Sequence, residues 1–94
     1  MNAQELTLNI AVNLGRLGRW AMEGKSKRIQ PFLQETQKFL DELEKAQKND
    51  CFQKTFQLFK KKFENLSKDV RLDKVWAEEM FTWANILTHR AKLA

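Results

Sequence analysis

The chain has 94 residues, 43% of them hydrophobic and 31% charged, and we treat residues 1–94 as a single helical-bundle domain because domains usually span about 50–250 residues. Seven Phe and three Trp disfavour a disordered chain, three Gly and one Pro exclude collagen-like and linker-like chains, and one Cys excludes an intrachain disulfide framework. The 17 basic and 12 acidic residues give a net charge of +5, which favours anionic partners but is also common in proteins that bind none.

Helical periodicity runs through almost the whole chain. Apolar residues recur at intervals of three and four, and no stretch alternates between polar and apolar residues as a half-buried strand does. The pattern predicts four helices, over residues 3–23, 28–48, 51–66 and 70–92. We therefore expect an all-α protein, an antiparallel four-helix bundle, with a helix seam between two chains.

The first predicted helix, residues 3–23, carries two apolar seams. The first seam consists of Leu6, Ile10, Leu14, Leu17 and Ala21. The second seam consists of Leu8, Ala11, Gly15, Gly18 and Met22. A helix on the outside of a core needs an apolar arc of roughly 100°, so this helix has more apolar surface than a monomer requires. We expect it either to lie centrally or to contact a second chain.

The second predicted helix, residues 28–48, has the clearest single stripe. Pro31 fits only in the first turn of a helix, where backbone N–H groups lack intrahelical partners, so the helix begins close to it. We expect Asn49 to end it in the left-handed conformation, and Asp50 to cap the next helix in a capping box with Gln53. Caps this close predict a tight antiparallel hairpin. The stripe consists of Ile29, Phe32, Leu33, Thr36, Phe39, Leu40 and Leu43.

The third and fourth predicted helices differ in the width of their apolar surface. The third is polar except for a narrow aromatic ladder of Phe52, Phe56, Phe59, Phe63 and Leu66, so we expect it to be peripheral. Ser67, Asp69 or Asp73 is expected to cap the fourth helix. The fourth helix, like the first, has a broad apolar arc, formed by Leu72, Val75, Trp76, Met80, Trp83, Ile86 and Leu87.

The second seam of the first helix is the main candidate for a functional surface. Gly inside a helix costs about 1 kcal/mol relative to Ala, so Gly15 and Gly18 on one face require a compensating close contact. One interpretation is a homodimer or partner-helix seam along Leu8, Ala11, Gly15, Gly18 and Met22. The other is close packing of the same residues against the fourth helix of the same chain.

Basic residues form a second candidate surface. One group lies around the end of the first helix, and the other falls at intervals of seven on the third helix, opposite the Phe ladder. Together they favour phosphate binding, and Trp20 is a candidate for stacking on a base. The alternative is ordinary solvation, with Trp20 part of the core. The two groups are Arg16, Arg19, Lys25, Lys27 and Arg28, and Lys54, Lys61 and Lys68.

Residues that carry chemistry are few. His89 is the only histidine, and we expect it to be exposed; Cys51 is expected to be a partly buried structural thiol. One His and one Cys do not make a structural zinc site, and neither a Gly-rich phosphate loop nor a nucleophile elbow is present. We expect no catalytic, cofactor-binding or metal-binding residues and no enzymatic activity.

The function indicated by the sequence is that of a small non-enzymatic interaction or scaffold protein that self-associates, or docks a partner helix, through the first helix. The alternative is an accessory nucleic-acid-binding bundle that uses the basic residues. No apolar run approaches the roughly 18–20 residues that a membrane span needs. The lack of a signal-like segment and the single thiol lead us to expect a cytoplasmic protein.

Overall fold

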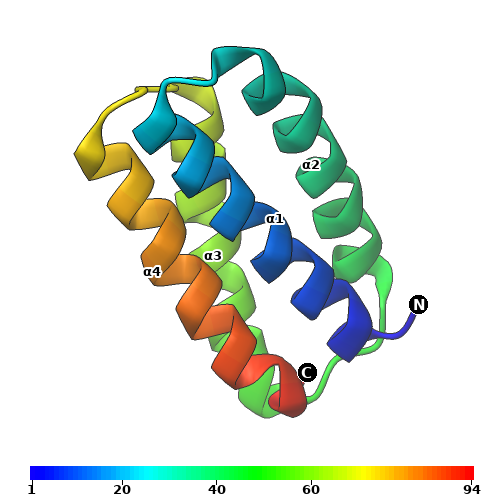
Figure 1. Ribbon diagram of the computed structural model, residues 1–94. Helices are drawn as coiled ribbons and strands as arrows, with labels where there is room; N and C mark the ends of the chain where they lie inside the picture. The colour runs from blue at the N-terminus through cyan, green and yellow to red at the C-terminus, as the bar shows by residue number, and fades with distance from the viewer.

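The computed structural model describes residues 1–94 and is built from four α-helices without strands (Figure 1). Short 3-10 helices follow the first and the last of them, at Ser26–Arg28 and Ala91–Leu93. The all-α four-helix class expected from the sequence is confirmed. None of the helices is both long enough and apolar enough to cross a membrane. The four helices are α1 (Ala3–Glu23), α2 (Ile29–Lys45), α3 (Asp50–Lys68) and α4 (Lys74–Arg90).

Local signals fix both ends of α1. Asn2 and Glu5 form a capping box, in which the Glu5 backbone N–H donates to Asn2 Oδ1 at 2.8 Å and the Asn2 N–H donates to Glu5 Oε1 at 3.2 Å. The helix ends at Gly24, whose φ of 70° is the left-handed conformation that glycine adopts without strain. The observed bounds of α1 are therefore those predicted from the sequence.

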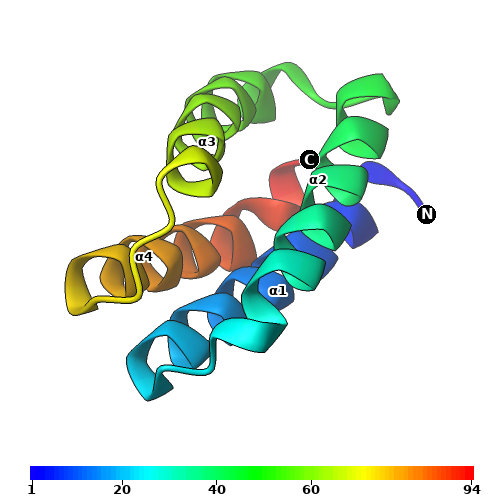
Figure 2. The ribbon, with the colours of Figure 1, turned by 90° about the horizontal axis from the view of Figure 1, so that it is seen from above.

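The helix α1 is central to the arrangement. It lies between α4 and α2, with α3 behind it in Figure 1 and across the core from it in Figure 2. The backbones of α1 and α4 approach each other most closely, and α2 is the next neighbour of α1. The first seam of α1 faces the core, and each of its members is no more than 2% exposed: Leu6, Ile10, Leu14, Leu17 and Ala21.

The backbone of α3 stands away from those of the other helices (Figure 2). Buried aromatic side chains make the contacts between them. The predicted ladder is confirmed, because its four Phe rings are no more than 1% exposed. Phe59 packs on Trp83 of α4 with ring centroids 5.5 Å apart. Trp76 donates its indole N–H to the carbonyl of Leu66 at 3.0 Å and so ties the start of α4 to the end of α3. Large rings thus replace close backbone contact here.

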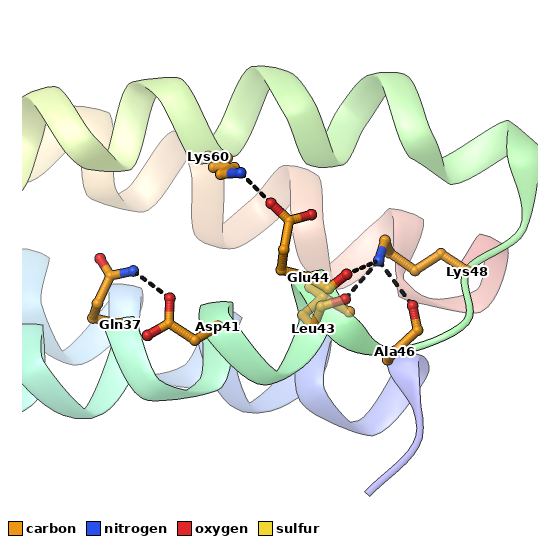
Figure 3. Close-up of polar contacts among 7 residues, drawn as sticks. All are labelled: Gln37, Asp41, Leu43, Glu44, Ala46, Lys48 and Lys60. Atoms are coloured by element: carbon orange, nitrogen blue, oxygen red, sulfur yellow. Dashed lines mark hydrogen bonds and ion pairs between the residues drawn. The ribbon is translucent and has the colours of Figure 1, made fainter.

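The end of α2 differs from the prediction. Asn49 is extended, with φ −70° and ψ 148°, and is not a left-handed cap. The Lys48 ammonium instead donates to three carbonyl oxygens at the end of the helix, so a left-handed residue is not needed to satisfy them (Figure 3). These acceptors belong to Leu43, Glu44 and Ala46, at 2.6, 3.1 and 2.9 Å.

The start of α3 also corrects the sequence prediction. Asn49 is the N-cap and makes no side-chain capping bond, while Asp50 is the first helical residue. The capping box expected for Asp50 and Gln53 is therefore wrong by one position. At this position the Asp50 carboxylate lies in the first turn, where a negative charge interacts favourably with the helix dipole.

The connection between α2 and α3 is short, but the two helices do not form the tightly packed hairpin that we expected. Residues 46–49 join them, and α3 then turns away from α2 (Figure 2). Side chains bridge the gap. Lys60 forms an ion pair with Glu44 (Figure 3), and the Lys48 ammonium lies 4.8 Å from the centroid of the Phe56 ring.

The helix α4 begins at Lys74, four residues later than predicted, after an N-cap at Asp73. The Asp73 carboxylate accepts a hydrogen bond from the backbone N–H of Trp76 at 2.8 Å. Asp73 was one of three capping residues that the sequence allowed, and the structure selects it. The cap at Asp73 therefore fixes the residue at which α4 begins, and α4 then packs along α1.

Candidate docking surface on the outer side of the first helix

The second seam of α1 is divided by the fold. Ala11 and Gly18 are buried within the chain. A Cβ atom added to Gly18 would lie 2.7 Å from Cε1 of Phe81, closer than real contacts allow, so the Phe81 ring of α4 occupies this site. The intramolecular interpretation of the seam therefore applies at Gly18. The other three members of the seam are at least partly open.

The outer side of α1 faces away from α3, toward the viewer in Figure 1. The large apolar side chains on this side are only partly covered by the rest of the chain. Leu8 is 39% exposed, Val12 52% and Met22 56%. Gly15 is half-buried, and no heavy atom lies within 4 Å of a Cβ built on it. The exposed ring of Phe81 extends this apolar surface onto α4.

One line of residues defines this surface, and we call it the outer stripe. Successive members are separated alternately by three and four residues, which is the spacing of one helix face. From the sequence we did not assign Glu5, Val12 or Arg19 to this face, although we named Arg19 as a basic candidate, because we followed the small residues Ala11 and Gly18 toward the side that α4 covers. The alternating spacing through the polar positions is the signal that identifies them. The outer stripe consists of Glu5, Leu8, Val12, Gly15, Arg19 and Met22.

The charges of the outer stripe have different surroundings from those beside it. The guanidinium of Arg19 is exposed and forms no ion pair within the chain. Arg16, by contrast, lies with its guanidinium carbon 5.8 Å from the centroid of the Phe32 ring, which directs it toward α2. Glu5 is exposed and uses one carboxylate oxygen in the capping box. Arg19 is therefore the free cation of the stripe and Glu5 its anion.

The basic residues at the end of α1 are exposed, but the aromatic residue among them is not. Trp20 is only 7% exposed, with Phe32 packed edge-on at 4.7 Å and the Arg28 guanidinium carbon 5.5 Å from its ring centroid. The ring has no free face for a base, which removes the stacking role considered for it. Lys25 forms an ion pair with Glu23 at 3.3 Å.

The predicted lysines of α3 are exposed on the face opposite the Phe ladder. Lys54 and Lys61 belong to α3, which lies across the core from α1 (Figure 2), so the fold does not join them to the basic residues of 16–28 in one binding surface. Lys68 donates to Glu64 at 2.8 Å. This hydrogen bond, the charge of Lys68 and the charge of Lys60 hold the pKa of the exposed Glu64 carboxyl below its ordinary value.

A groove between α3 and α4, of about 420 Å³, was not anticipated from the sequence. Leu58 lies off the Phe ladder and is exposed, which was the available signal. Cys51 is exposed, contrary to the partly buried position that we expected. It precedes the first ring of the ladder, and its Sγ lies 3.6 Å from the carbonyl oxygen of Leu93. The groove is lined by Cys51, Lys54, Thr55, Leu58, Trp83, Ile86 and Arg90.

The remaining titratable candidate, His89, is exposed as expected. Its Nδ1 lies 2.9 Å from the carbonyl oxygen of Asn85 one turn earlier, a contact within α4 itself. His, Cys, Asp and Glu side chains do not gather in groups of three or more anywhere in the chain. Among the surfaces described, the outer stripe is the one on which large, partly exposed apolar side chains align along one helix face.

Comparisons with known proteins complete the description of these surfaces. They covered models of protein families, curated proteins and solved structures. None of the three comparisons gives a match to this chain.

Proposed function

We propose that this protein is a small helical interaction protein that self-associates through the outer stripe of α1. The observation that supports the proposal is the row of exposed apolar side chains along one helix face, beside the exposed ring of Phe81. Contiguous apolar surface that a monomer leaves open is typical of interfaces between proteins. The fold leaves about half of each of these side chains open to solvent, and contact with a partner would cover that part.

The length of the outer stripe suits a helix–helix interface. From Glu5 to Met22 it extends about 26 Å at 1.5 Å per residue, compared with 37 Å for the longest dimension of the molecule. A second helix laid along it covers Leu8, Val12 and Met22 together. Full burial of a large aliphatic side chain contributes about 1.5–3 kcal/mol relative to exposure, and these side chains begin part-exposed, so each contributes a fraction of that amount.

A matched pair of variants tests the proposal. Val12→Glu places a charge in the middle of the outer stripe, whereas Leu58→Glu places the same charge at a comparably exposed apolar position on α3, where the native side chain is 56% exposed. Light scattering coupled to size-exclusion chromatography measures the solution mass. We expect Val12→Glu to give a monomer and Leu58→Glu to keep the oligomer of the unmodified chain. Equal association of both variants contradicts the proposal.

A second candidate function, nucleic-acid binding, is favoured by one observation. A hollow at the turn after α1 is lined by residues without a negative charge, namely Gly24, Lys25, Ser26, Lys27 and Arg28. A cluster of basic residues of this kind binds backbone phosphates of a nucleic acid independently of the base sequence. Binding to RNA or DNA at about 50 mM salt, lost by about 200 mM and abolished by charge reversal at Lys25, Lys27 and Arg28, is the expected result. Lack of binding at the lower salt concentration rejects this function.

A further inference from the structure

The outer stripe is complementary to itself when its direction is reversed. Its members form two columns in which residues are seven apart, or about 10 Å along the helix. One column contains Glu5, Val12 and Arg19, and the other contains Leu8, Gly15 and Met22. Reversal about the level of Val12 exchanges Glu5 with Arg19 in the first column. In the second column it brings Leu8 to within one residue, about 1.5 Å, of the level of Gly15, and it brings Met22 to the level of Asn2, just before the start of the other helix. An acidic residue thus changes places with a basic one, and a large residue comes close to the level of the smallest.

A twofold axis perpendicular to two antiparallel helices produces this exchange. In an isologous interface the same surface patch on both copies makes the contact, so residue i meets residue j and residue j meets residue i. With the axis at the level of Val12, the two Val12 side chains meet each other. Glu5 of each copy then lies opposite Arg19 of the other, and Leu8 lies within one residue of the level of Gly15.

The size match concerns Leu8 and Gly15. Apart from the backbone of its own helix, a Cβ built on Gly15 meets no heavy atom within 4 Å, so the space above this glycine is open; we call this gap in the row of side chains the hollow. The Leu8 side chain is 39% exposed and has no large neighbour that covers it fully. In the antiparallel pair each Leu8 enters the hollow over Gly15 of the other copy. This contact gives Gly15, which costs about 1 kcal/mol in a helix relative to Ala, a packing role.

The charge match concerns Glu5 and Arg19. Arg19 has no ion-pair partner in its own chain, and Glu5 has one carboxylate oxygen outside the capping box. The antiparallel pair contains two Glu5–Arg19 contacts. A parallel twofold pair instead places Arg19 against Arg19, Glu5 against Glu5 and Gly15 against Gly15, which adds like-charge repulsion and leaves an unfilled hollow. Charge and size therefore both select the antiparallel arrangement.

We propose that the partner of the outer stripe is a second copy of this chain, packed antiparallel about a twofold axis at Val12, with Glu5 facing Arg19 and Leu8 facing Gly15. This proposal rests on the proposed function, self-association through α1, and adds the orientation and register of the two helices.

Site-specific crosslinking tests the register. Cys51 is exposed, so the single-cysteine variants are made in a Cys51→Ser background. Val12→Cys is expected to form a disulfide-linked dimer on mild oxidation with diamide. Leu8→Cys and Gly15→Cys are each expected to crosslink poorly alone and readily as a mixture of the two. Efficient self-crosslinking of Leu8→Cys and Gly15→Cys would show a parallel pair and overturn the proposal.

Charge exchange supplies an independent test that needs no oxidation. In homodimers, Glu5→Lys and Arg19→Glu each replace both attractive contacts with like-charge contacts, and we expect each to weaken association about tenfold or more. Mixing the two variants restores both opposite-charge contacts, so a heterodimer is expected at close to the original affinity. Arg16→Glu is the matched control, since Arg16 lies toward α2. Circular dichroism checks that Glu5→Lys, which removes one capping contact, keeps the helix.

The results distinguish this proposal from the function on which it rests. If the unmodified chain associates and Val12→Glu makes it monomeric, but mixing gives no heterodimer, self-association stands and the antiparallel register is wrong. If the unmodified chain stays monomeric, both proposals fail.

Discussion

Gly18 and Gly15 lie about one turn apart on α1, but their surroundings differ. At Gly18 the ring of Phe81 lies so close that a Cβ atom would meet it at 2.7 Å, whereas at Gly15 no atom lies within 4 Å. The first glycine permits the close approach of α1 and α4 within the chain. The second has no such contact in the folded monomer. A glycine in a helix therefore indicates a close neighbour only when the rest of the fold shows what lies beside it.

The largest expected difference is between the core side and the outer side of α1. Leu14 is buried in the core, so Leu14→Ala is expected to lower the free energy of unfolding by about 2–5 kcal/mol through lost contacts and a cavity. Val12→Ala on the outer side should change it by less than about 0.5 kcal/mol. Denaturant titrations at low-micromolar protein concentration measure both. A cost above about 2 kcal/mol at Val12 would mean that the outer side is packed within the monomer.

A smaller difference is expected between the two glycines. Gly18→Leu must displace the Phe81 ring and is expected to destabilise the monomer by about 1–3 kcal/mol. Gly15→Ala meets open space and should stabilise the monomer by about 0.5–1 kcal/mol, because alanine is the better helix former. Thermal unfolding of the dilute variants measures both changes. Destabilisation by Gly15→Ala would contradict the open environment of Gly15.

We expect Gly15→Leu to weaken self-association, which separates the role of Gly15 from that of Gly18. The leucine side chain fills the hollow that Leu8 of the second copy is proposed to enter, so association should weaken while the monomer stays folded. Gly18→Leu is not an equivalent test, because it disturbs the contact of α1 with α4 in the same chain. Sedimentation of Gly15→Leu beside the unmodified chain measures the effect. Unchanged association would show that the hollow at Gly15 lies outside the interface.

The smallest expected effect is on the pH dependence of stability, and it comes from the Glu64–Lys68 pair on α3, away from α1. Lys68 and Lys60 lower the pKa of Glu64 from its ordinary value of 4.5. The pair with Lys68 therefore stabilises the fold above pH 4.5, and its contribution is lost as the pH falls through the lowered pKa. Carboxyl NMR titration should give Glu64 a midpoint below 4.5, and Lys68→Ala should move that midpoint upward. An unmoved midpoint would show that Lys68 does not hold the Glu64 carboxylate.

The sequence predicted what depends on neighbouring residues. The bounds of α1 at residues 3 and 23 were predicted from its periodicity, and the structure shows that a capping box of Asn2 and Glu5 and the left-handed Gly24 set them; the spacing of the four Phe residues places the buried face of α3. These features follow from the period of the helix and from hydrogen bonds made within one turn. The same reasoning placed the N-cap of α3 one residue late, at Asp50, and it expected a left-handed cap at Asn49 because it did not anticipate that Lys48 would satisfy the carbonyl groups at the end of α2.

The division of the second seam of α1 was not predictable in the same way. Ala11 and Gly18 are covered because α4 passes beside them, and the position of α4 is set by distant contacts, including Trp76 against Leu66 and Phe59 against Trp83. Periodicity identifies a face of a helix but does not say which neighbour covers it. The outer stripe of Glu5, Val12 and Arg19 beside Leu8, Gly15 and Met22 became recognisable only when the covered side was known.

The central claim is that the outer side of α1 is an interface between two copies of the chain. Sedimentation equilibrium of the unmodified protein, from about 1 to 500 µM in salt that screens long-range charge, tests it most directly. The account predicts that the weight-average mass rises with concentration from 11.1 kDa toward twice that value and then levels off. A mass that stays at that of one chain over the whole range would contradict it.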